Sequence, residues 1–141
     1  MNGAKQIIGV MVLGLAFFLV SATTVTATSV VSDKGLYVVS FRSNTEPIPI
    51  NRIHTWVLSV RHPDGTPVTG ASIRIDGDMP AHGHGLPTRP EVTEELGNGD
   101  YEIEGIKFQM PGAWVMDFTV RLVVNSALAK VSSRSYCSRH Q

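Results

Sequence analysis

The sequence predicts an all-β protein, an immunoglobulin-like antiparallel β-sandwich of about six to seven strands. Three observations lead to this prediction. After Ser29, apolar residues recur with a period of two in short runs, as they do in half-buried strands. Glycine, proline, asparagine and aspartate separate these runs. No helical period is sustained after residue 27.

Six segments have the alternation expected of strands, and turn-forming residues separate them. They are residues 36–42, 53–62, 71–76, 91–96, 101–108 and 113–120, the last of which can continue to residue 124. In two of these segments a row of mostly large apolar side chains shares one face, which we expect to form the core. The rows are His54, Trp56, Leu58 and Val60 in one strand and Trp114, Met116, Phe118 and Val120 in the other.

The N-terminal segment has the pattern of an export signal. Lys5 precedes an uncharged, mainly apolar run over residues 7–20, and small residues that suit cleavage follow up to Ala22 and Ala27. We therefore expect residues 1–27 to be a cleaved signal peptide or, if they are retained, an anchor in the inner membrane through residues 7–22. Either alternative predicts an exported domain that is periplasmic or extracellular.

One sandwich domain is expected over residues 33–124. Residues 125–141 are rich in serine and basic residues, and the sequence leaves two alternatives open for this basic tail. Residues 127–131 supply a last strand, or the tail does not belong to the domain. Residues 28–118 carry seven Lys or Arg against twelve Asp or Glu. This acidic balance, without basic stripes, argues against a nucleic-acid-binding role.

The turns predict which segments meet at each end of the sandwich. Pro63-Asp64-Gly65 and Gly97-Asn98-Gly99 consist of residue types that reverse a chain between antiparallel strands. If successive strands are antiparallel, both turns lie at one end. His54, the loop over residues 77–90 and residues 109–112 then lie together at the other end.

This second end collects five side chains that can bind a metal: His54, Met79, His82, His84 and Met110. Imidazole nitrogen and thioether sulfur suit copper, and sulfur favours Cu(I), whereas zinc prefers histidine with cysteine or carboxylate. Gly83 lets the backbone bend so that the two flanking imidazoles can turn toward one centre. We therefore predict a copper site, with Cu(I) favoured, at this end.

The same residues have structural alternatives. His54 can instead be a residue at a strand start whose ring bonds a backbone carbonyl, and Met110 can plug the end of the sandwich. Trp114 is expected in the core. The chain has no Gly-x-Ser-x-Gly motif, phosphate-binding loop or His-Glu-x-x-His motif, so we expect no enzymatic activity.

Residues 49–56, 78–85 and 110–114 carry a family resemblance. Its most specific parts are a Met-Pro-x-His-Gly-His motif from Met79 to His84 and a Met-Pro-Gly-x-Trp motif from Met110 to Trp114. With these motifs the chain resembles the FixH/YtkA-like family of small exported or membrane-anchored domains. The resemblance implies an immunoglobulin-like β-sandwich, and some members of the family are associated with copper handling or with cytochrome oxidase assembly.

The resemblance also implies a function and a set of partners. It points to His54, Met79, His82, His84 and Met110 as metal ligands. Copper storage or delivery is then the expected function, and the expected partners are the copper ion and a membrane protein or oxidase assembly factor. The alternative is a metal-free interaction module that acts in the assembly of a respiratory membrane complex.

Overall fold

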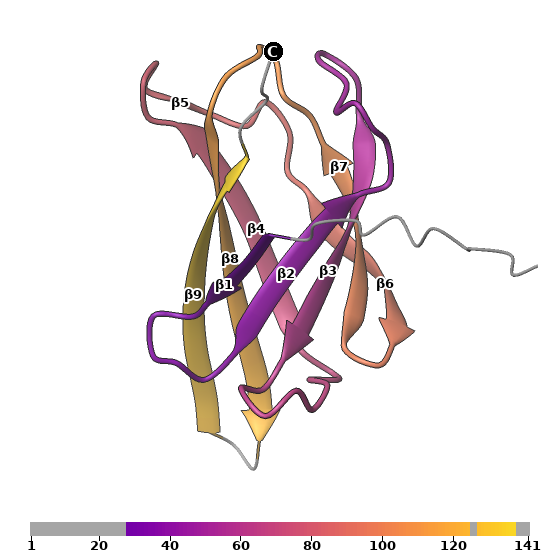
Figure 1. Ribbon diagram of the computed structural model, residues 1–141, viewed down its shortest axis with the longest axis vertical. Helices are drawn as coiled ribbons and strands as arrows, with labels where there is room; N and C mark the ends of the chain where they lie inside the picture. The colour runs from indigo at the N-terminus through magenta and orange to yellow at the C-terminus, as the bar shows by residue number, and fades with distance from the viewer. Residues whose placement is uncertain (1–27, 125–126, 138–141) are drawn as a thin grey trace, which may run out of the picture.

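The computed structural model describes residues 28–124 and 127–137, which form a β-sandwich (Figure 1). In these residues the chain has nine strands and no helix. The strands are β1 (Thr28–Val31), β2 (Val38–Ser43), β3 (His54–Arg61), β4 (Ser72–Met79), β5 (His84–Gly85), β6 (Glu91–Gly97), β7 (Asp100–Ile106), β8 (Trp114–Val124) and β9 (Ala127–Cys137). The predicted all-β sandwich is confirmed.

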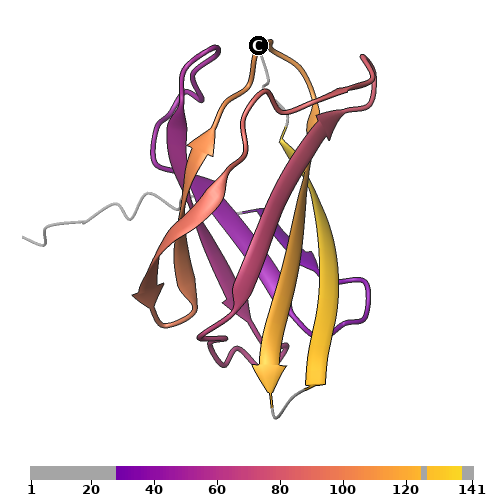
Figure 2. The same ribbon diagram turned by 180° about the vertical axis from the view of Figure 1, so that it is seen from behind.

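The strands form two antiparallel sheets that face each other across the core (Figures 1 and 2). One sheet has the strand order β1-β2-β3-β7-β6, and the other has the order β5-β4-β8-β9. The chain crosses from one sheet to the other between β3 and β4, between β5 and β6, and between β7 and β8. These crossings bring segments that are distant in the sequence to the same end of the sandwich.

Two strands lie outside the predicted domain boundaries. β1 precedes residue 33 and pairs with β2. β9 follows residue 124 and pairs with β8 from Val124↔Ala127 to Trp114↔Cys137. Of the two alternatives for the C-terminal tail, the structure contains the last strand, and this strand is longer than residues 127–131. The predicted signal peptide or anchor, residues 1–27, lies outside the described residues, and within them no helix is long and apolar enough to span a membrane.

Each of the six predicted strands has a counterpart: β2, β3, β4, β6, β7 and β8. The largest difference concerns β4, which continues past residue 76 to Met79 because it pairs with β8 as far as Asp78↔Val115 and with β5 at Met79↔His84. The predicted loop over residues 77–90 therefore begins as a strand, and the short strand β5 lies inside it.

The core lies between the two predicted rows of β3 and β8. All eight side chains of these rows are buried, and all except His54 and Trp114 are wholly inaccessible to solvent. Phe41 stacks on Trp56 with ring centroids 4.6 Å apart. Alternate burial along both strands fixes their register, because a shift by one residue would turn each row to solvent.

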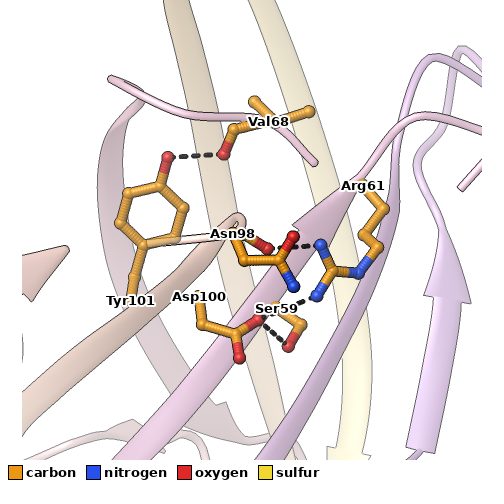
Figure 3. A network of polar contacts seen from close by, with 6 residues as sticks. All are labelled: Ser59, Arg61, Val68, Asn98, Asp100 and Tyr101. Carbon is orange, nitrogen blue, oxygen red and sulfur yellow. Dashed lines mark hydrogen bonds and ion pairs between the residues drawn. The ribbon is translucent and has the colours of Figure 1, made fainter. Parts of the chain in front are cut away.

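The two ends of the sandwich differ in their side chains. We call the end formed by residues 79–85, residues 109–112 and the start of β3 the His84 end. The opposite end, formed by residues 59–68 and 97–101, is the Asn98 end, and Figure 3 shows its polar network. There Gly99 has a φ of +75°, and a β-carbon on it would lie 2.5 Å from the carbonyl oxygen of Val60. Only glycine fits this turn without a shift of the backbone.

Candidate functional site

The turn between β4 and β5 brings two histidines together. The carbonyl of Met79 accepts hydrogen bonds from the backbone N–H of His82, at 2.9 Å, and of Gly83, at 3.0 Å. Gly83 has a φ of +66°, a left-handed conformation that favours glycine, as predicted from the His-Gly-His spacing. The ring centroids of His82 and His84 are 5.9 Å apart as a result.

A second turn, over residues 109–112, lies against the first. The side chain of Gln109 places its Nε2 atom 3.1 Å from Nδ1 of His84. Trp114, which follows the turn, donates from Nε1 to the carbonyl of Met110 at 3.1 Å, and its ring centroid is 5.7 Å from that of His84. The turn that carries Met110 is therefore held beside the His84 ring.

The side chain of Met79, the residue at the start of the first turn, packs against the second turn. This side chain is 3% exposed, and a β-carbon on Gly112 would collide with its terminal methyl group. Glycine at position 112 therefore leaves the room that the Met79 thioether occupies. Met110 is half-buried and packs against the core. The predicted alternative in which Met110 plugs the end of the sandwich is compatible with this packing.

Exposure differs among the candidate ligands. His82 is exposed and His84 is half-buried, so both imidazoles can be reached from solvent. The structure thus brings His82 and His84 together between the two segments that carry Met79 and Met110. The candidate donors at the His84 end are therefore two imidazoles and two thioethers.

His54 lies at the same end but deeper in the molecule. Its ring contacts Phe108, with centroids 5.5 Å apart, and Trp56, at 6.2 Å. Phe108 in turn contacts Trp114, at 5.2 Å, and Trp114 contacts His84. Two aromatic rings therefore lie between His54 and His84, and the structure does not place His54 in contact with the other candidate ligands.

The hydrogen bonding of His54 matches the structural alternative predicted for it. The ring is 6% exposed, and its Nδ1 atom lies 3.2 Å from the carbonyl oxygen of Arg52. Its Nε2 atom is buried and has no hydrogen-bond partner among the described residues. Burial lowers the pKa of His54, although the contact with the Arg52 carbonyl opposes this shift. The neutral imidazole is therefore favoured in the folded protein.

The types of side chain limit which metals the site suits. In residues 28–124 and 127–137, no three side chains from His, Cys, Asp and Glu come close enough to hold a metal ion. Beside the two imidazoles, the remaining candidate donors at the His84 end are the thioethers of Met79 and Met110. Such a set matches Cu(I), whereas zinc sites are built from histidine with cysteine or carboxylate.

Two further residues at this end were not among the predicted ligands. Trp114 is in the core as predicted, at 1% exposure, but its ring also contacts His84. Gln109 contacts His84 directly, although no sequence pattern singles it out within residues 109–112. Their positions could only be found from the structure, because both contacts join residues at least 25 positions apart in the chain.

Comparison with known proteins agrees with this arrangement. A family model described as YtkA-like matches residues 33–119, more than half of the chain. No curated protein matches the sequence. No solved structure matches it either. The matched residues include most of the sandwich core and every residue of the His84 end, as the resemblance of the two motifs predicted. The chain therefore belongs to the YtkA-like family.

Proposed function

We propose that this protein is an exported copper-binding domain that stores or delivers copper without catalysing a reaction. The observation that carries the proposal is the pair of imidazoles at the His84 end, with ring centroids 5.9 Å apart. The pair lies on the turn that starts at Met79 and beside the turn that carries Met110. Export is proposed from the apolar segment over residues 7–20.

The ligands proposed for copper are His82, His84, Met79 and Met110. Their nitrogen and sulfur donors are neutral, so they favour a soft, singly charged ion such as Cu(I) over a harder divalent ion. His54 is not proposed as a direct ligand, because Phe108 and Trp114 lie between it and His84. We propose instead that His54 supports the aromatic layer beneath the site.

Metal analysis of the purified protein tests this function. The protein is loaded with one equivalent of Cu(I) under reducing, oxygen-free conditions, and a Cu(I) chelator then competes for the metal. We expect one copper ion per chain and much weaker retention of Zn(II) in a parallel titration. A protein that holds no copper against the chelator, or that binds zinc equally well, contradicts the proposal.

A second candidate function, the metal-free interaction module, is favoured by the open side of the sandwich. A groove of about 870 Å³ runs between β4 and β6, lined by residues 71–76, 86 and 88–92. Within the described residues β4 pairs with β5 only at Asp78 and Met79, and the carbonyl of Gly77 accepts a hydrogen bond from the backbone N–H of Leu86, so residues 72–76 form a free strand edge along this groove. An exposed strand edge can pair with an extended segment of another protein.

The two candidate functions differ in their dependence on the histidines. The double variant His82→Ala, His84→Ala, expressed in cells that depend on the protein for respiratory oxidase assembly, separates them. A copper carrier loses its activity in this variant. An interaction module that uses the β4 edge keeps it.

A further inference from the structure

Gln109 bridges the two turns of the His84 end through one nitrogen atom. Its Nε2 atom lies 3.1 Å from Nδ1 of His84 and 3.4 Å from the carbonyl oxygen of Gly85. The other end of the same carboxamide, Oε1, is buried and has no hydrogen-bond partner in the part of the chain that the structure describes. The NH₂ group of the amide therefore faces both the ring of His84 and the carbonyl of Gly85.

The carbonyl of Gly85 determines which way the carboxamide points. A carbonyl oxygen only accepts hydrogen bonds, so the amide NH₂ must face it, and a reversed carboxamide would set oxygen against oxygen. The second N–H of Gln109 is then directed at Nδ1 of His84, which must offer a lone pair. A neutral imidazole carries one ring proton, and in His84 this proton is consequently on Nε2.

Neither ring nitrogen of His84 is free in this arrangement. The Nδ1 lone pair accepts from Gln109, and Nε2 carries the proton. We propose that Gln109 is a positioning residue that holds His84 as its Nε2–H tautomer and thereby restrains copper binding by this imidazole. The part of the proposal that concerns copper rests on the proposed function, whereas the tautomer does not.

Binding through either nitrogen of His84 requires the contact with Gln109 to break. A metal at Nδ1 takes the lone pair that Gln109 uses. A metal at Nε2 moves the ring proton to Nδ1, where it meets an N–H of Gln109 instead of an acceptor. Gln109 therefore lowers the affinity of the site for copper. A lower affinity suits a protein that must release copper to a recipient.

Nitrogen-15 NMR spectroscopy of the copper-free full chain at about pH 8, where an ordinary imidazole is neutral, tests the tautomer. We expect Nδ1 of His84 to resonate as an unprotonated nitrogen with a through-hydrogen-bond coupling to Nε2 of Gln109. In the variant Gln109→Glu the carboxylate can only accept, so we expect the ring proton on Nδ1. His82 has no contact with Gln109, and its spectrum is the internal control. A proton on Nδ1 in the wild type, or an unchanged tautomer in Gln109→Glu, overturns the proposal.

A competition titration with Cu(I) tests the restraint. The variant Gln109→Leu keeps the approximate size of the side chain and removes the donor, so its copper affinity should rise about 2- to 10-fold, the worth of one hydrogen bond. Circular dichroism checks that the variant is folded. An unchanged copper affinity would overturn the proposal that Gln109 restrains copper binding. If neither protein binds copper, the proposed function fails, while the NMR result still decides the tautomer.

Discussion

The two ends of the sandwich differ in whether their polar atoms have hydrogen-bond partners. At the Asn98 end, Ser59 donates to Asp100 at 2.5 Å, and Arg61 contacts both Asp100, at 3.2 Å, and the carbonyl of Asn98 (Figure 3). Tyr101 donates its hydroxyl to the carbonyl of Val68 at 2.7 Å. At the His84 end, by contrast, Nε2 of His54 and Oε1 of Gln109 are buried without a hydrogen-bond partner among the described residues.

Under the proposed function, this difference corresponds to a structural end and a metal-binding end. A buried polar atom without a partner destabilises the fold by about 1–3 kcal/mol. The Asn98 end avoids this cost because its polar groups pair with one another. The His84 end, by contrast, keeps two buried polar atoms without a hydrogen-bond partner in the described part of the chain. The comparison therefore predicts that changes at the His84 end alter metal binding and that changes at the Asn98 end alter stability.

The largest effect is expected from the double variant His82→Ala, His84→Ala. Loss of both proposed imidazole ligands should lower copper affinity by at least about 100-fold, since even a change to a residue that only supports a metal ligand costs about 10- to 100-fold. Stability should fall by no more than about 1.5 kcal/mol, because His82 is exposed and only the half-buried His84 loses a hydrogen bond, to Gln109. Competition titration measures the first value and urea unfolding the second. Retained affinity would remove the histidines from the site.

The variant Tyr101→Phe is the matched change at the Asn98 end. The hydroxyl donates to Val68 and accepts from the backbone N–H of Ala71 at 3.2 Å, so its loss leaves a buried carbonyl without a partner. We expect the free energy of unfolding to fall by about 1–3 kcal/mol. Copper affinity should stay within the error of the titration. A loss of copper binding in this folded variant would contradict the division of roles between the two ends.

A fall in pH should destabilise the protein, because His54 takes up a proton more readily in the unfolded chain than in the folded one. Because burial lowers the pKa of His54 below its usual 6.5, only the unfolded chain takes up a proton there as the pH falls below that value. The free energy of unfolding therefore drops between pH 6.5 and the folded-state pKa, by at most about 1.4 kcal/mol per pH unit, and then levels off. The variant His54→Phe keeps an aromatic ring against Phe108 and should flatten this slope.

Melting temperatures measured from pH 7 to pH 5 check the prediction for His54. The control is His62→Gln, a change to the half-buried histidine at the Asn98 end, whose ring lies 5.4 Å from that of Tyr37. This control measures how much the slope changes when a histidine outside the His84 end is replaced. Equal slopes in the wild type and in His54→Phe would show that His54 is not protonated selectively in the unfolded chain.

Some strands could be predicted from the sequence and others could not. The faces of β3 and β8 were predicted correctly because mostly large apolar side chains occupy every second position along them, and burying such a row fixes both the strand and its orientation. β9 could not be assigned, because most of residues 130–135 are serine or basic and give no apolar alternation. Its strand conformation comes from backbone pairing with β8, which side-chain patterns do not reveal.

The sequence could predict at which end of the sandwich the candidate site lies. It could not predict how deeply each candidate side chain is buried. Chain reversal alone places His54, His82, His84 and the turn at Met110 at one end of the sandwich. The separation of His54 from His84 depends on how Phe108 and Trp114 pack between them, with centroids 5.2 Å apart. Packing of this kind is decided by the whole core, so no local pattern in the sequence contains it.

The smallest effect is expected from Arg61→Ala at the Asn98 end. The side chains of Arg61 and Asp100 are each 29% exposed, so solvent and salt weaken their ion pair, which contributes about 0–1 kcal/mol. Asp100 keeps its hydrogen bond from Ser59 in the variant, which limits the loss further. Unfolding in urea should show this small decrease at low salt and almost none at 1 M salt, where charges are screened within about 3 Å. A decrease above about 2 kcal/mol at both salt concentrations would mean that the network in Figure 3 acts as one cooperative unit. The Asn98 end would then depend on Arg61 as strongly as on the buried hydroxyl of Tyr101.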